Sequence, residues 1–164
     1  MTLVEVLVVI VVISLLLAIS ASALRNFWLV KSLQAAQDDV ISQLKQDQQR
    51  SESESAPMVY GARFQKGTST WGTVQYNGNT GACAVVNSVT FDTGVVVANS
   101  TDFPDATGTT ACRNASPDAS ANNEVVFFYP SGSATAGSAI LSQPAIGRTG
   151  TVMVSAVTGR VYKP

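Results

Sequence analysis

Histidine is absent from the 164 residues of this chain, and only 13% of the residues are charged. Without histidine, the sequence excludes a His general base, a His-containing catalytic triad and a His-ligated metal site. The net charge of −1 gives no basic excess from which nucleic-acid binding would be inferred. We expect neither enzymatic activity nor a cofactor.

Cysteine is scarce as well, because the chain contains only Cys83 and Cys112. In an oxidising compartment an isolated pair most simply forms one disulfide, and two buried thiols are the alternative. A Cys83–Cys112 bridge encloses 28 residues, for which the chain-entropy treatment gives about 3 to 4 kcal/mol of stabilisation. The sequence has no CxxC pair, which argues against a redox or metal site.

Charge is missing altogether from Val6 to Leu24, a run of 19 residues that is nearly all Val, Ile, Leu, Ala or Ser. As a helix this run is about 28 Å long, close to the roughly 30 Å of hydrocarbon in a bilayer. Since only a helix satisfies its own backbone in lipid, we predict that residues 1–24 form a transmembrane or filament-core helix. An ordinary secretory signal ending at Ala21-Ser22-Ala23 is the alternative, although the sequence lacks the basic start of such a signal.

Glu5 lies at the edge of this apolar run, where an unpaired carboxylate is costly. One interpretation is an interfacial Glu that only marks the end of a membrane span. A second uses the α-amino group of Met1, which lies one helical turn from Glu5. If identical helices pack side by side with an axial stagger, Glu5 of one chain meets the Met1 amine of the next, and both charges are neutralised.

The segment Met1-Thr2-Leu3-Val4-Glu5, followed by the apolar run, resembles the mature N-terminus of type IV pilins and type II secretion pseudopilins. The resemblance implies a filament subunit with an N-methylated Met1, whose short basic leader has been removed by a prepilin peptidase. It also implies residence in the inner membrane before an assembly machine builds the extracellular pilus. Ser14 and Ser22 depart from the pattern, since many pilins have Gly and Pro near those positions.

The helix should continue beyond the apolar run as an amphipathic segment, residues 25–55. One predicted face consists of Phe27, Val30, Leu33, Val40 and Leu44, and the polar face of Lys31, Gln34, Asp38, Lys45, Asp47 and Arg50. We expect the apolar face to lie against the chain's own globular domain, with a coiled-coil dimer as the alternative.

Residues 56–164 are rich in Thr, Ser, Gly, Asn and Val, which predicts a β-rich extracellular head with many turns. The expected strands are 58–64, 72–76, 82–86, 89–91, 94–98, 124–129, 139–142, 151–157 and 160–162, with a long loop at 99–123. Calcium binding by Asp92, Asp102, Asp105 and Asp118 is an alternative that lacks the spacing of a calcium loop. The predicted fold class is α+β: a long N-terminal helix, transmembrane in one half and amphipathic in the other, packed on an antiparallel β-rich head.

A second, weaker resemblance covers the C-terminal part. Val126-Phe127-Phe128-Tyr129-Pro130-Ser131-Gly132 and the closing Thr158-Gly159-Arg160-Val161 are similar to the end of H-type minor pseudopilins and FimT/FimU-type minor pilins. Together the resemblances imply a structural subunit of a type IV pilus or related filament, with roles in adhesion, motility or DNA uptake. The partners implied are further copies of the chain, other pilins and the assembly machinery, with DNA or a host surface as open options. The alternatives are a minor tip pilin or type II secretion pseudopilin, and a membrane-tethered binding module that does not polymerise.

Overall fold

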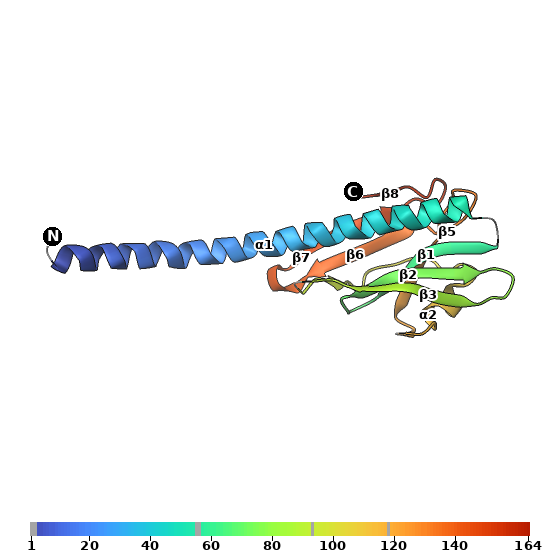
Figure 1. The fold of residues 1–164 in the computed structure, drawn as a ribbon, viewed down its shortest axis with the longest axis horizontal. Coiled ribbons are helices and arrows are strands. Elements are labelled where there is room, and N and C mark those ends of the chain that lie inside the picture. The colour runs from blue at the N-terminus through green and yellow to red at the C-terminus, as the bar shows by residue number, and fades with distance from the viewer. Residues whose placement is uncertain (1–2, 55–56, 93, 118) are drawn as a thin grey trace.

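The computed structural model describes residues 3–54, 57–92, 94–117 and 119–164, and for residues 18–23 it describes the backbone alone. A single helix, α1 (Leu3–Ser53), runs for 51 residues. Its first part extends away from the rest of the chain as a stem, and its second part packs on a β-rich head. The start of α1 therefore lies far from the head, and the C-terminus lies beside the half of α1 that packs on the head (Figure 1), where Lys163 Nζ donates to Asp38 Oδ1 at 2.6 Å.

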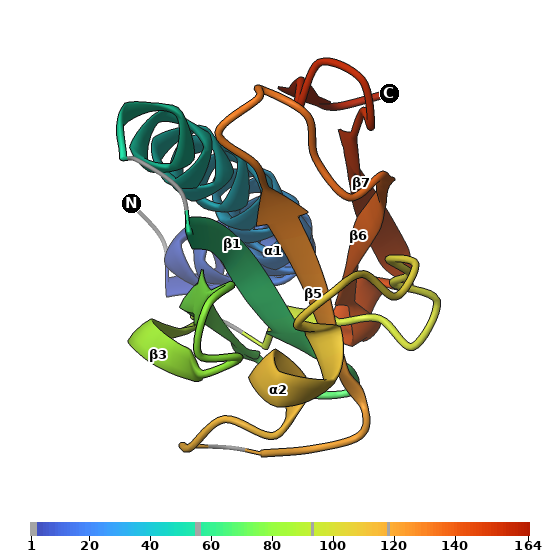
Figure 2. The same ribbon diagram turned by 90° about the vertical axis from the view of Figure 1, so that its right-hand side faces the viewer.

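The head contains two antiparallel sheets that flank α1. The first sheet has the order β3-β2-β1-β5, and its strands are β1 (Met58–Gln65), β2 (Thr70–Asn77), β3 (Cys83–Thr90) and β5 (Asn123–Phe128). The second has the order β4-β6-β7-β8, with β4 (Val96–Val97), β6 (Gly137–Gln143), β7 (Arg148–Val154) and β8 (Val161–Tyr162). The C-terminal half of α1 contacts both sheets, as the end-on view shows (Figure 2).

The second half of α1 packs on the head through an apolar stripe at helical spacing. Leu33, Ala36, Val40 and Leu44 are buried in one cluster with side chains from both sheets. Gly150 of β7 permits the close approach of the helix, because a Cβ at this position would lie 2.4 Å from the Gln37 side chain. The second half of the helix is therefore held by the head on one face and is open to solvent on the other.

Aromatic rings fill the core between α1 and the first sheet. Phe64 and Trp71 are directly opposed in the β1–β2 register, and their ring centroids lie 6.0 Å apart. The stack extends to Phe103 on one side, at 5.9 Å from Phe64, and to Phe91 on the other, at 5.7 Å from Trp71. These near-parallel rings connect β1 and β2 to the segments that join the two sheets.

The expectation of a transmembrane half is wrong for the residues that the structure describes. Among them, no helix combines the length and the apolarity that a membrane crossing requires. The corrected fold class is α+β, with a long N-terminal helix and two antiparallel sheets.

Three smaller expectations also need correction. Phe27 is exposed and does not belong to the buried face of α1, whereas Asp47, expected on the polar face, is fully buried. The two strands expected at 82–86 and 89–91 form one strand, β3, with a register shift opposite Thr73 and Val74. The expected loop 99–123 contains a short helix, α2 (Thr109–Arg113), and contributes the buried Phe103 to the core.

We expect Leu44→Ala to lower the free energy of unfolding by about 2 to 5 kcal/mol, because it opens a cavity beneath α1. Leu44 is fully buried in the cluster shared by the helix and both sheets. The matched control is Leu15→Ala in the exposed stem, which should change head stability by less than about 0.5 kcal/mol. Chemical denaturation followed by near-ultraviolet circular dichroism measures both, and equal effects of the two substitutions would contradict the packing described.

Candidate assembly surface

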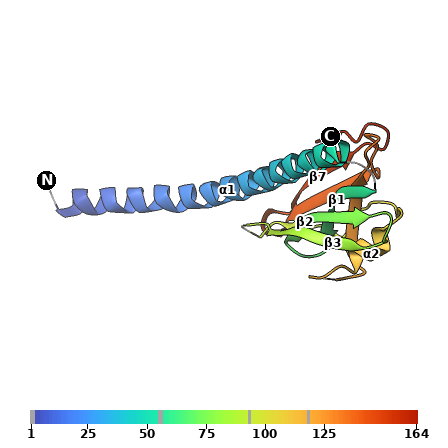
Figure 3. The same cartoon turned by 45° about the vertical axis from the view of Figure 1, so that its right-hand side comes forward.

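The first part of α1 projects from the head as an apolar stem. Every described side chain from Leu3 to Leu17 is exposed, and the large apolar ones retain 45% to 83% of their accessible surface. Figure 3 shows this part of the helix extending well beyond both sheets. Soluble monomers rarely expose a continuous apolar surface of this kind, so the stem has the character of an interaction surface.

Glu5 lies in the first turn of α1, at the end of the stem that is furthest from the head, and its side chain is exposed. A carboxylate in the first turn of a helix interacts favourably with the helix dipole, which compensates part of the cost of an acid in apolar surroundings. Met1, expected to pair with Glu5 of a neighbouring chain and to be N-methylated, lies outside the described residues. The pairing between Met1 and Glu5 therefore stays a prediction from the sequence.

The stem is internally satisfied where it carries a hydroxyl. Ser14 Oγ donates a hydrogen bond to the Ile10 carbonyl oxygen, at 2.8 Å within the same helix. A serine bonded in this way needs no water or outside partner. Ser14 therefore leaves the helix backbone continuous and adds no obligatory polar contact to the stem surface.

A cationic and aromatic collar marks the point where the stem meets the head. Phe27 and Trp28 are exposed, and their rings meet edge to face at 6.1 Å. Lys31 Nζ lies 5.7 Å above the Phe27 ring and donates to Gln34 Oε1 at 3.2 Å. The stem's apolar surface thus gives way within two turns to a helix surface with charged and polar side chains.

The head end of α1 is held to the first sheet by a buried carboxylate. Gln43 Nε2 donates to Asp47 Oδ1 at 3.1 Å, and Thr73 Oγ1 of β2 donates to both Asp47 oxygens at 3.2 and 3.3 Å. Burial raises the pKa of Asp47 to about 6, and the hydrogen bonds from Gln43 and Thr73 offset part of that rise. Sequence periodicity could not find this residue, because its partner Thr73 lies 26 residues further along the chain.

A second attachment lies one turn further along the helix. Ser51 Oγ donates to the Phe128 carbonyl oxygen of β5 and accepts a hydrogen bond from the Tyr60 backbone N–H of β1 at 2.9 Å. Tyr60 Oη donates to Glu54 Oε1 at 2.8 Å. The last turn of α1 is thus hydrogen-bonded to β1, inside the first sheet, and to β5, at its edge.

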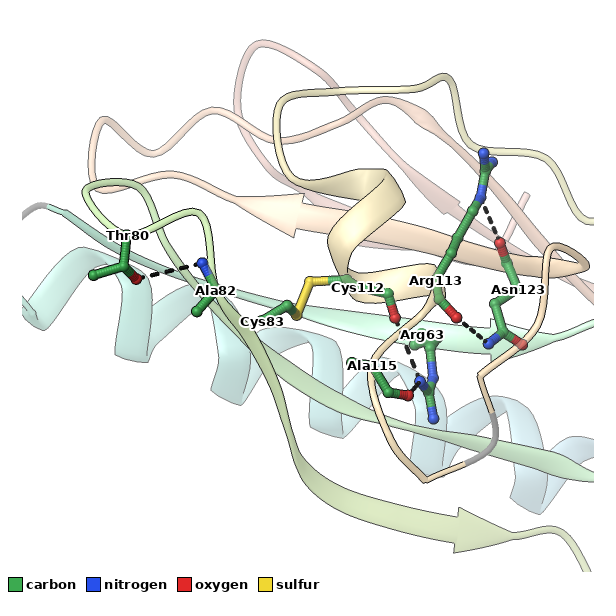
Figure 4. The surroundings of a disulfide bond; sticks show 8 residues. All are labelled: Arg63, Thr80, Ala82, Cys83, Cys112, Arg113, Ala115 and Asn123. Atoms are coloured by element: carbon green, nitrogen blue, oxygen red, sulfur yellow. Dashed lines mark hydrogen bonds between the residues drawn. A yellow bond between two sulfur atoms is a disulfide. The ribbon is translucent and has the colours of Figure 1, made fainter.

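The two cysteines form a disulfide that ties β3 to α2, with a Cα–Cα distance of 5.1 Å (Figure 4). Beside it, the buried Arg63 donates to the carbonyl oxygens of Cys112 at 3.3 Å and Ala115 at 2.7 Å. At the start of α2, Gly108 adopts φ 94°, and a Cβ there would lie 2.7 Å from the Tyr76 ring. The disulfide and Arg63 therefore fix the loop on the face of the first sheet opposite α1.

The aspartates considered for calcium are not gathered into a site in the part of the chain that the structure describes. No group of three or more His, Cys, Asp or Glu side chains there could hold a metal ion. Asp105 instead forms an ion pair with Arg113 Nη1 at 2.8 Å. Asp118 lies outside the described residues.

We expect Asp47→Asn to change how stability depends on pH. The ordinary carboxyl pKa of 3.8 rises to about 6 in the folded chain, so the folded state binds the extra proton between these values. Stability from this group is therefore highest below about pH 4, falls as the pH rises to about 6 and is level above it. The shift corresponds to a cost of about 3 kcal/mol for the ionised form near pH 7.

Urea unfolding at several pH values between 4 and 8 tests this expectation. Asp47→Asn should remove the fall in stability between pH 4 and 6 and raise stability at pH 7.5, whereas Asp39→Asn, at an exposed acid on the same helix, should preserve the wild-type profile. An unchanged slope in Asp47→Asn would show that another group is responsible.

Comparison with known proteins yields no match for this chain among family models, curated proteins or solved structures.

Proposed function

We propose that this chain is a structural subunit of a type IV pilus or related cell-surface filament and that it has no enzymatic role. The observation that carries the proposal is the stem: an apolar helix surface exposed on all sides, continuous with a helix whose other half is seated on a folded head. Stems of further copies are the proposed occupants of this surface, and the heads form the outer wall of the filament.

A helix with apolar residues on all faces is matched by a bundle of like helices rather than by one groove. Association of such helices depends on side-chain packing, since the stem surface offers few polar groups. The proposed filament core is therefore a set of parallel stems, and each head remains on the outside because its polar strands and loops favour water.

The Glu5 carboxylate supplies register in this proposal. In parallel stems, the Met1 amine of one chain comes level with Glu5 of its neighbour when the helices are shifted by about four residues, or about 6 Å. The attraction between amine and carboxylate is strong in the apolar core, and it is lost when either charge is removed. One acid in each stem thus selects one stagger among many that apolar packing alone would allow.

The similarity of the C-terminal segment to H-type pseudopilins and FimT/FimU-type minor pilins favours a minor or tip subunit as the second candidate. A chain of that kind would join the filament at low copy number and would need other pilins as partners. A tethered binding module that never polymerises would retain the same head but would not need Glu5.

Replacing Glu5 with Gln should abolish incorporation into filaments, because the side chain keeps its size and loses the charge that sets the stagger. The matched control is Glu52→Gln, an exposed acid near the head end of the same helix, which should assemble normally. Immunoblotting of sheared surface filaments and of the cell fraction measures both variants. Normal incorporation of the Glu5 variant would reject the pairing, and absence of the wild-type chain from all filaments would reject the proposed function.

Intact-mass analysis of the chain from its native source tests the processing that the N-terminal pattern implies. We expect a mature chain that begins at Met1 and carries one additional methyl group on its α-amine. A mature chain that begins at Leu24 would instead indicate an ordinary secretory signal and would exclude a stem-based filament.

A further inference from the structure

Strand β3 is a long edge of the first sheet with a single neighbour, β2. The opposite edge, β5, is covered by the segment that follows it, since the Thr135 N–H donates to the Phe127 carbonyl oxygen at 2.9 Å. The edge strands of the second sheet, β4 and β8, are two residues each. In the described part of the chain, β3 is thus a full-length edge strand whose side away from β2 pairs with no strand, and the end-on view shows it at the edge of the sheet (Figure 2).

The composition of β3 does not protect this edge. Its eight residues, CAVVNSVT, contain no charge, no proline and no glycine. Natural edge strands are commonly blocked by Lys or Pro or kept very short, because their free N–H and C=O groups can bind another strand. Val86 is half exposed at the centre of β3, so the strand offers apolar surface as well as backbone groups.

The outward-facing backbone groups can be assigned from the register. Phe91 N–H donates to the Ser69 carbonyl oxygen at 2.8 Å, and Asn77 N–H donates to the Ala82 carbonyl oxygen at 2.9 Å. In an antiparallel pair, residues whose backbone groups point toward the partner strand alternate with residues whose backbone groups point away from it. Phe91 and Ala82 both point toward β2, so the direction of each β3 residue can be counted from either end of the strand. The count places the outward-facing groups at Cys83, Val85, Ser88 and Thr90.

The assignments made from the two ends of β3 meet at a β-bulge in the middle of the strand. The pairing shifts between Thr73 and Val74, so that β3 carries one extra residue at Val86. The step between the outward-facing residues Val85 and Ser88 is therefore three residues, where a regular strand has two. A second β3 carries the same extra residue at the same place, whereas a regular strand has no residue to set against it.

From this match we infer that β3 binds β3 of a second copy of this chain, antiparallel across a two-fold axis. Val85 of one copy faces Ser88 of the other, and Cys83 faces Thr90, so all four outward-facing residues of each strand are paired. Asp92, the charged residue next to the strand, falls opposite Gly81 of the other copy, and no like charges are opposed. The two four-stranded sheets become one continuous sheet across two heads.

This contact goes beyond the proposed function, because it uses the head and does not require the stem. Since β3 runs roughly along the axis of α1, antiparallel pairing directs the two stems away from each other (Figure 1). Parallel stems in one filament core cannot be related in this way. Within the filament proposal, the contact therefore joins subunits of different filaments rather than neighbours in one.

Spin-label distances in the full-length chain, solubilised in detergent, test the inference. A nitroxide on an engineered cysteine at Ser88 lies about three residues along the strand from its equivalent, so the two backbones are roughly 10 Å apart there. A label at Thr80 lies about thirteen residues from its equivalent, or roughly 43 Å. We expect short-range coupling for the Ser88 label and long-range coupling for the Thr80 label, both increasing with protein concentration.

Ser88→Pro supplies the blocking variant, because it removes an outward-facing N–H that does not bond to β2. It should raise the dimer dissociation constant at least tenfold, while Ser88→Ala, which keeps the N–H, should leave it unchanged. Coupling of the Thr80 label that persists in Ser88→Pro would indicate contact through the stems and would overturn the inference. The distances from the two labels decide the question on the otherwise unaltered chain even if Ser88→Pro does not fold, and equal distances or no coupling would reject β3 pairing.

Discussion

The seating of one helix face on two sheets is the constraint on which this structure depends. Leu33, Val40 and Leu44 belong to a single core with side chains from both sheets. The first sheet buries a second, smaller apolar cluster on its other face, against α2, but the larger core is the one in which α1 contacts strands of both sheets. Apolar burial at this junction stabilises the head, because the favourable transfer of these side chains from water scales with the area they bury.

The same helix behaves differently in its two halves because its sequence changes from uniformly apolar to two-faced. The second half buries its apolar stripe against its own head, whereas the described apolar side chains of the first half stay exposed. Polar contacts fix how the halves are joined: Asp47 and Ser51 connect the helix to β1, β2 and β5 at defined positions. Burying an acid lowers the stability of the folded state, but its hydrogen bonds favour one position of the helix on the sheet over neighbouring positions.

Local patterns were sufficient for much of the fold. Alternating and β-branched stretches predicted the positions of most strands, and helical spacing identified Leu33, Val40 and Leu44 as a buried face. Patterns failed where partners are distant in sequence: Asp47 is buried against Thr73, and Phe103 enters the core from a segment with loop composition. Glu5 was identified from the sequence alone, and its pairing with another chain stays a prediction, because a single chain does not contain the partner.

Because α1 is continuous from the stem to the head, the number of residues between them determines how the head is rotated about the stem axis. Each residue of a helix advances about 1.5 Å and turns about 100°. Inserting one residue between Leu24 and Leu33 would therefore swing the head by more than a quarter turn around the stem axis, with hardly any change in reach. Inserting seven would bring it back to within about 20° of its original azimuth. The angular placement of every head in an array of such stems is thus encoded in the length of this short stretch of helix.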